Sequence, residues 1–369
     1  MLLCDSGAED ACAAEASRSL VVKEQGMSYV LADAPDERTA MRAVYHAQTI
    51  THACLFLGKC DGAPDERIAR ELVATTIPVE GRSFAVRSHS PEHLGTGTQR
   101  LNELFGGPIK DATGLPVDLE TPELIFVPFT NGSKTLLGLS LAKTDLRKRD
   151  YKVFSSNKSL RSTIAAAILF LSGYTGKERF LLPYEDDGTL AIEAALFATR
   201  TSPYKYSKQF SLFWPWLSEL FEQEDTDLAK AEIAVCTPSV QFLKAVQKNA
   251  KIAGILPSLK LMKAELDWLD TKFDEQCVDI MLAQLPNSSK HRDEKEVKKI
   301  ADDLAYEANY VLVDGGTLGI LCLRPDELLP SFTKHRFTEV RRHALWMGAQ
   351  QISLMILRKE MRAQKEKST

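Results

Sequence analysis

The chain has 369 residues, of which 44% are hydrophobic and 26% charged, an ordinary globular mixture that is long enough for two or three domains. Its formal net charge of -4 excludes a uniformly basic nucleic-acid-binding protein, so any such contact has to come from a local basic segment. The longest apolar run, residues 164–171, is too short to span a bilayer, and the N-terminus lacks the basic and apolar regions of a signal peptide. We therefore expect a cytoplasmic protein without membrane association.

The cysteines and histidines give no sign of a structural cross-link. The seven cysteines include no C-x-x-C pair and are odd in number, which favours reduced thiols over a disulfide framework. The seven histidines do not fall at the spacing of metal ligands, so the sequence predicts no metal site.

Short elements alternate over residues 1–141 in the manner of an α+β domain. Apolar spacing predicts helices over 8–20, 66–75 and 98–113, the last of which ends at Gly114. Strands are predicted over 49–57, 83–88, 124–129 and 134–141. Asn131-Gly132 lies between the last two strands and is the strongest type of short hairpin signal.

A charged stretch over 145–152, followed by the turn-forming residues 155–158, marks a boundary between compact units. After it, helices are predicted over 160–171, 190–198, 240–253 and 294–310, and strands over 179–182, 231–236, 278–283 and 317–323. This alternation predicts βαβ units and a mainly parallel sheet. Two further strands, 338–341 and 351–357, follow in succession and indicate an antiparallel edge pair.

Several segments around and after the boundary carry more specific letters. Leu146-Arg-Lys-Arg-Asp-Tyr-Lys152 is similar to the L-x-K-R-G-Y-R element that closes a THUMP domain, and residues 160–169 resemble the P-L-K-E-T-L-A-A-A-L-L helix that opens a methyltransferase half. Residues 182–195, Leu-Pro-Tyr-Glu-Asp-Asp-Gly-Thr-Leu-Ala-Ile-Glu-Ala-Ala, resemble D-P-M-C-G-S-G-T-x-x-I-E-A-A. Residues 245–254 resemble A-x-x-N-A-x-x-A-G, residues 210–216 resemble F-x-F-x-x-W-x-W, and residues 345–348 resemble W-x-G.

In order and spacing these segments resemble the THUMP-containing, class I S-adenosylmethionine-dependent guanine-N2 methyltransferases of tRNA and rRNA over residues 140–360. The resemblance implies an α/β fold, with a Rossmann-like class I methyltransferase domain over 156–360. Before it, the resemblance implies an α+β ferredoxin-like unit over 1–60 and a THUMP-like RNA-binding domain over 61–150. It also implies S-adenosylmethionine as the cofactor and structured RNA, with tRNA expected, as the partner.

The resemblance places Pro183, Asp186, Gly188 and Thr189 in the loop that faces the methyl donor. Enzymes of this class use glycines there, because the backbone approaches the ligand and the amides of the helix N-terminus face its carboxylate. Here Asp186 stands in place of the first loop glycine, between two further acids. A carboxylate about 4 Å from the ligand carboxylate costs about 4 kcal/mol, roughly three decades of affinity. An acid here could instead pair with the ligand ammonium, and an ordinary solvated strand-to-helix turn is a further interpretation.

The resemblance places the ribose and adenine contacts at the ends of the next two strands. Val235-Cys-Thr-Pro238 stands where the family carries an acid that accepts the ribose hydroxyls. Thr237 is a weaker acceptor, and we expect it to be the N-cap of the following helix. Glu265 is a candidate adenine contact, with plain surface as the alternative.

The acceptor pocket is implied at Gln284-Leu-Pro-Asn287, which matches the family's N-P-P-Y (or F). In that motif an amide oxygen and a carbonyl orient the guanine amine, and the aromatic ring stacks on the base. Gln284 offers the same amide one methylene farther out, Pro286 is retained, and Asn287 cannot stack. A strand end followed by a polar loop fits the same letters.

A basic segment at the end of the THUMP-like part is the candidate RNA contact. It comprises Lys143, Arg147, Lys148, Arg149 and Lys152. A solvated charged surface is the alternative. Because the changes fall at three ligand-facing loops, two functions stay open: an active RNA methyltransferase, or a non-catalytic RNA-binding protein or partner subunit that kept the fold. A third alternative is an α/β enzyme with another nucleotide ligand.

Overall fold

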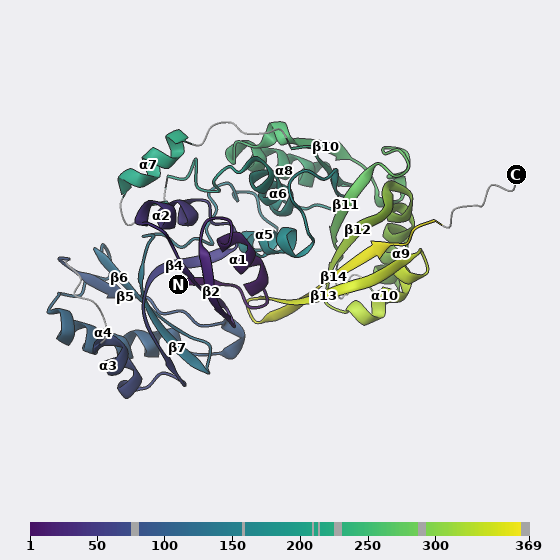
Figure 1. The fold of residues 1–369 in the computed structure, drawn as a ribbon. Helices are drawn as coiled ribbons and strands as arrows, with labels where there is room; N and C mark the ends of the chain where they lie inside the picture. The colour runs from purple at the N-terminus through teal and green to yellow at the C-terminus, as the bar shows by residue number, and fades with distance from the viewer. Residues whose placement is uncertain are drawn as a thin grey trace, which may run out of the picture. The chain divides into compact units, whose positions relative to one another are not determined.

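The computed structural model describes residues 1–74, 81–156, 159–208, 210–212, 215–224, 231–286 and 293–362. The chain divides into two compact units (Figure 1). Unit 1 comprises Met1–Arg149, Ser207–Thr226 and Trp346–Gln350, and unit 2 comprises Asp150–Tyr206, Asp227–Leu345 and Gln351–Thr369. Within the described ranges, no helix is both long and apolar enough to cross a membrane.

Unit 1 is built on one seven-stranded sheet in the order β2-β3-β1-β4-β7-β6-β5. The strands are β1 (Leu2–Cys4), β2 (Val21–Gly26), β3 (Tyr29–Asp33), β4 (Ile50–Asp61), β5 (Phe84–Val86), β6 (Leu124–Thr130) and β7 (Lys134–Ser140). Its helices are α1 (Glu9–Ala16), α2 (Glu37–Tyr45), α3 (Glu66–Ala74) and α4 (Thr98–Thr113), with a 3-10 turn at Glu92–Leu94. The predicted hairpin is confirmed, because β6 and β7 pair antiparallel and the Asn131 side chain accepts from the Lys134 amide at 2.9 Å.

One sheet runs through both ranges that the resemblance assigns to separate N-terminal parts. Strand β4 pairs with β1 on one side and with β7 on the other. Helices α3 and α4 pack on the sheet through buried apolar side chains such as Leu72 and Phe105. The division into a ferredoxin-like unit (1–60) and a THUMP-like domain (61–150) stays a prediction.

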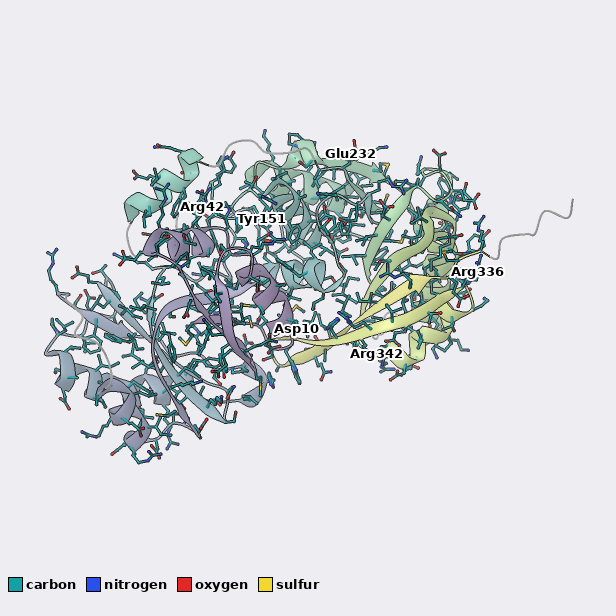
Figure 2. All side chains as sticks on the ribbon, in the orientation of Figure 1. Asp10, Arg42, Tyr151, Glu232, Arg336 and Arg342 are labelled. Atoms are coloured by element: carbon teal, nitrogen blue, oxygen red, sulfur yellow. The ribbon has the colours of Figure 1, made fainter. Side chains whose placement is uncertain are left out.

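An aromatic segment from later in the chain completes the core of unit 1. Helix α7 (Pro215–Glu224) contributes Phe221, which is fully buried, with its ring centroid 5.6 Å from that of Tyr45 on α2. The Phe210 ring lies 6.0 Å from the same tyrosine, and the Arg42 guanidinium lies 5.8 Å above the Phe221 ring (Figure 2 labels Arg42). Residues 1–149 therefore depend on an aromatic ring supplied from beyond residue 200.

Phe221→Ala should destabilise the protein by about 3–5 kcal/mol, because it removes a buried aromatic ring and leaves a cavity beside Tyr45. Urea unfolding followed by circular dichroism measures this free energy. Leu119→Ala, at a side chain that is 72% exposed, is the matched control and should change it by less than about 0.5 kcal/mol. Equal effects of the two substitutions would contradict the proposed role of the aromatic segment.

Unit 2 contains a second seven-stranded sheet, in the order β10-β9-β8-β11-β12-β14-β13. The strands are β8 (Phe180–Leu182), β9 (Ile233–Thr237), β10 (Leu259–Lys263), β11 (Val278–Gln284), β12 (Leu312–Cys322), β13 (Phe337–Met347) and β14 (Gln350–Lys359). Strands β8 to β12 pair with one another in parallel, and β14 runs antiparallel to β12. This confirms the predicted parallel-rich Rossmann-like sheet with its last two strands at one edge.

Helices lie on both sides of this sheet (Figure 1). The helices are α5 (Ser162–Leu171), α6 (Thr189–Thr199), α8 (Val240–Ile252), α9 (Glu294–Val311) and α10 (Pro325–Thr333), with 3-10 turns at Leu256–Ser258 and Leu266–Trp268. Buried apolar side chains of α9 and α10 pack with those of β11, β12 and β14. Tyr151 anchors the start of unit 2 (labelled in Figure 2), since its hydroxyl donates to the buried Glu193 of α6 at 2.7 Å. Because helices cover both faces of the sheet, we expect a ligand site at the carboxyl ends of the parallel strands and the loops that follow them.

Candidate functional site

The predicted donor loop comprises residues 183–188, between β8 and α6. It lies at the carboxyl end of a central parallel strand, as predicted. Pro183 follows the strand directly and is buried, and Gly188 precedes the first residue of α6, Thr189. Gly188 has a φ of 81°, and a Cβ there would come within 2.8 Å of Val246 Cγ1 and 3.2 Å of Val246 Cα on α8. Glycine is therefore required here by the close packing of the loop on α8, whatever ligand the loop meets.

The acids of this loop accept hydrogen bonds from the backbone amides at the start of α6. Glu185 Oε2 accepts from the Gly188 amide at 2.9 Å. Asp187 Oδ1 accepts from the Thr189 amide at 3.1 Å and from its hydroxyl at 2.8 Å, and the other Asp187 oxygen accepts from the Ser159 hydroxyl. Amides at a helix N-terminus are the groups that bind an anionic ligand. Here the chain's own carboxyl groups satisfy two of them.

The same loop changes the protonation of Glu185. Burial, followed by the neighbouring carboxylates of Asp187 and Asp186, raises the pKa of Glu185 from its ordinary 4.5 to about 8. The Gly188 amide and Lys152 act in the opposite direction and do not overcome the burial. Glu185 is therefore largely protonated at neutral pH.

The predicted acceptor residues share a cavity with the donor loop. Gln284 is the last residue of β11, and Pro286 follows two residues later. Both line a cavity of about 40 Å³ together with Glu185, Asp186, Asp187 and Thr189. Ligand pockets measure about 300–1,000 Å³, so this cavity has room for about one water molecule. Asn287 lies outside the described residues.

The ends of β9 and β10 offer no carboxylate in the position of a ribose acceptor. Thr237 ends β9 and is fully buried, and it is not the N-cap that we predicted. Helix α8 begins two residues later than that prediction requires, so Ser239 is the N-cap and accepts from the Phe242 amide, while the Thr237 hydroxyl accepts from the Ser239 amide. Glu265 is exposed after β10, outside the lining of the 40 Å³ cavity.

The residues of the unit therefore do not fit S-adenosylmethionine as the family binds it. The amides that would face the donor carboxylate are bonded to Glu185 and Asp187. The cavity lined by Gln284 has about a tenth of the volume of an ordinary ligand pocket. The side chain at the end of β9 is a buried threonine, where the family carries an acid. No chemical step that runs through the donor follows from this geometry.

The predicted basic segment separates into exposed and structural side chains. Lys143 and Lys148 are exposed. Arg149 is buried, and its guanidinium donates to the carbonyls of Leu146 and Gln48, so its position does not support the predicted contact with RNA.

The two remaining residues of the segment are bonded to neighbouring groups. Arg147 is half-buried and pairs with Asp145 through two guanidinium nitrogens, at 3.0 and 2.8 Å. Lys152 donates to the Leu160 carbonyl. Asp145 is a near neighbour of Arg147 in the sequence, whereas the Leu160 carbonyl lies eight residues beyond Lys152.

Two histidines come together in unit 1 without any signal in their spacing. The rings of His52 and His89 lie 3.5 Å apart, centroid to centroid. Burial lowers the pKa of both imidazoles, and the charge of Arg147 acts in the same direction. Across the described ranges, no group of three or more His, Cys, Asp or Glu side chains is placed to hold a metal ion.

The raised pKa of Glu185 predicts a pH-dependent stability. The folded protein holds the proton of Glu185 more tightly than the unfolded chain does. The resulting contribution to the free energy of unfolding is fully present below about pH 4.5, decreases as the pH rises, and is lost above about pH 8. Glu185→Gln cannot ionise, so its melting temperature should exceed that of the parent increasingly from about pH 5 to about pH 9. Differential scanning fluorimetry at constant ionic strength tests this. A difference that does not change with pH would contradict it.

Comparison with known proteins places this site in a family. The family model described as "RMKL-like, methyltransferase domain" matches residues 149–352. A tRNA (guanine(6)-N2)-methyltransferase of Methanocaldococcus jannaschii is 24% identical over 274 residues, 70% of this chain and 71% of that protein. A ribosomal RNA large subunit methyltransferase K/L of Vibrio parahaemolyticus is 31% identical over 181 residues, 46% of this chain but 24% of that protein.

Solved structures agree on the fold. TrmN from Thermus thermophilus has a TM-score of 0.71 at 19% identity, with 97% of this chain and 98% of that chain covered. SMU.472, solved in complex with SAH, has a TM-score of 0.75 at 17% identity, with 98% of each chain covered. The chain therefore shares its fold with these two solved structures over nearly its whole length. With more than half of its length matched by the family model, the chain belongs to the RMKL-like methyltransferase-domain family.

Proposed function

We propose that the chain is an RNA-binding member of this family that does not transfer methyl groups itself. The observation that carries the proposal is the donor loop, in which Glu185 and Asp187 accept from the amides of Gly188 and Thr189. A ligand carboxylate would have to displace these internal acceptors and would meet Asp186 on the same loop. Binding the donor therefore costs free energy that an ordinary glycine-rich loop does not require.

The RNA part of the proposal rests on the relatives and on two lysines. The Methanocaldococcus and Vibrio relatives are named as methyltransferases of tRNA and of ribosomal RNA. Lys143 and Lys148 are exposed and stand five residues apart at the end of the first part of unit 1. We take structured RNA, with tRNA as the first candidate, as the ligand of this surface. A non-catalytic member would act as an RNA-binding protein or as the partner subunit of an active enzyme.

The competing function is the activity in the name of the Methanocaldococcus relative, methylation of guanine N2 in tRNA. In its favour, Gln284 and Pro286 line the same cavity as the donor loop, and methyl transfer requires the donor and the base to be neighbours. In that case Gln284 would position the base. The internally bonded amides of the donor loop and the small volume of the cavity at Gln284 count against this function. Measurements of donor binding and methyl transfer distinguish the two functions.

Calorimetry with S-adenosylmethionine should give no binding isotherm up to about 1 mM, because the amides of the donor loop are already bonded to Glu185 and Asp187. The companion measurement is tritiated methyl incorporation into tRNA, for which we expect none above background. A micromolar dissociation constant, or methyl transfer that disappears in Gln284→Ala, would establish the competing function instead.

Replacing Lys143 and Lys148 together by alanine should weaken tRNA binding and reduce the slope of log K against log salt by about 2, because each lost phosphate contact contributes about 0.9. Filter binding across a salt series measures both quantities. Lys177→Ala, an exposed lysine in unit 2, is the matched control and should leave the slope unchanged. An unchanged slope in the double variant would remove this surface from the proposal.

A further inference from the structure

A second and larger cavity borders the donor loop, within unit 2. Its volume is about 650 Å³, which lies in the range of small-molecule sites and is more than ten times that of the cavity at Gln284. Residues 153–156 form one wall and the outer face of α8 forms another. Asp186 and Asp187 line both cavities, so the larger one opens beside the loop already described. No residue pattern in the sequence pointed to it.

Helix α8 presents one face to this cavity. Gln241, Lys244, Ala245 and Lys248 line it and follow one another at the three- and four-residue spacing of a single helix face. The two lysines are exposed and lie one turn apart. Ala245 has no side chain beyond Cβ, which leaves room above the helix between them. The face therefore offers two ammonium groups beside an open apolar surface.

The opposite wall carries an aromatic ring on a fixed backbone. The Phe154 side chain is 39% exposed, although the backbone that carries it is held firmly. The buried Asn249 of α8 accepts from the Phe154 amide at 3.1 Å and donates to the Phe154 carbonyl at 2.8 Å. The ring is thus presented at a defined place, with the Lys248 ammonium 4.5 Å from its centroid.

We propose that this cavity binds one nucleotide, with its base stacked on Phe154 and its phosphate held by Lys244 and Lys248. The proposal deepens the proposed RNA binding and rests on it for the source of the nucleotide. Stacking of a base on an aromatic side chain is stronger than an exposed cation–π contact, so a base can take the place of the Lys248 ammonium. The displaced ammonium sits on a flexible stem one turn from Lys244, where the two charges together suit a phosphate.

The acids set the direction in which the nucleotide lies. Asp187 is turned to Thr189 and Ser159. Asp186 accepts from the Ser156 hydroxyl at 3.5 Å and lines the end of the cavity next to the donor loop. A carboxylate repels a phosphate but accepts hydrogen bonds from hydroxyls. The phosphate therefore belongs at the lysine end, and the ribose hydroxyls belong on the side of Asp186.

Two probes test the site on the full chain: adenosine 5′-monophosphate by calorimetry, and a fluorescein-labelled five-nucleotide oligoadenylate by anisotropy. Phe154→Ala should weaken binding by roughly 5- to 150-fold, the range measured for loss of one stacked base. Lys244→Ala with Lys248→Ala should also weaken it and lower the salt slope for the oligonucleotide by about 0.7 per phosphate contact. Phe154→Tyr keeps the ring and should bind like the parent, as should Lys251→Ala, an exposed lysine of the same helix that does not line the cavity.

The outcomes separate the source of the nucleotide from the existence of the site. Tighter binding of the oligonucleotide than of the mononucleotide identifies RNA as the source. Tighter binding of the mononucleotide supports the site and identifies a free nucleotide as its ligand. Failure of both probes to bind, or equal binding by the parent, Phe154→Ala and the double lysine variant, would overturn the proposal. Because neither short probe needs Lys143 or Lys148, this result is independent of the tRNA test of the proposed function.

Discussion

The buried side chain of Asn249 makes the interactions on which the two cavities beside the donor loop depend. Its amide nitrogen donates to the carbonyls of Phe154 and Asp187, and its oxygen accepts from the Phe154 amide. One side chain thus joins α8, the segment that enters unit 2 and the donor loop. The bond to Asp187 is buried and the two bonds to Phe154 are part-buried, so these three bonds hold the three segments together. The contact of Gly188 with Val246 brings the same loop and helix together from the other side.

Long elements with a clear period could be predicted from the sequence, and partnerships between distant segments could not. Helices α8 and α9 carry apolar faces and the strands near them are short apolar runs, so a mainly parallel sheet followed from the rhythm, although the order of its strands did not. The short strands β1, β2 and β3 were missed, because three to six residues give too little pattern to distinguish a strand from a loop. The membership of residues 207–226 in unit 1 was also missed, because packing between distant segments leaves no local pattern.

At the site, the sequence identified the places and the structure identified what the side chains do there. The donor loop, Gln284 and Pro286 were predicted as neighbours, and they line one cavity. The residue type does not determine where a carboxylate points. The hydrogen bonds that Glu185 and Asp187 accept from the amides at the start of α6 were therefore not predicted. Arg149 in the basic segment is a second example. Its guanidinium is buried and donates to two carbonyls, so it has a structural role that its charge alone does not predict.

The carboxyl groups of the donor loop explain how the fold can persist without the donor. A helix N-terminus leaves several amides unsatisfied, and in a glycine-rich loop a bound anion can stabilise them. Here Glu185 and Asp187 are covalently tethered beside those amides, so they satisfy them at any concentration of ligand. Protonation of Glu185 relieves the repulsion among the three acids that such an arrangement creates. The start of α6 is therefore stabilised by the chain itself, and the proposed RNA-binding surfaces do not depend on the donor to be formed.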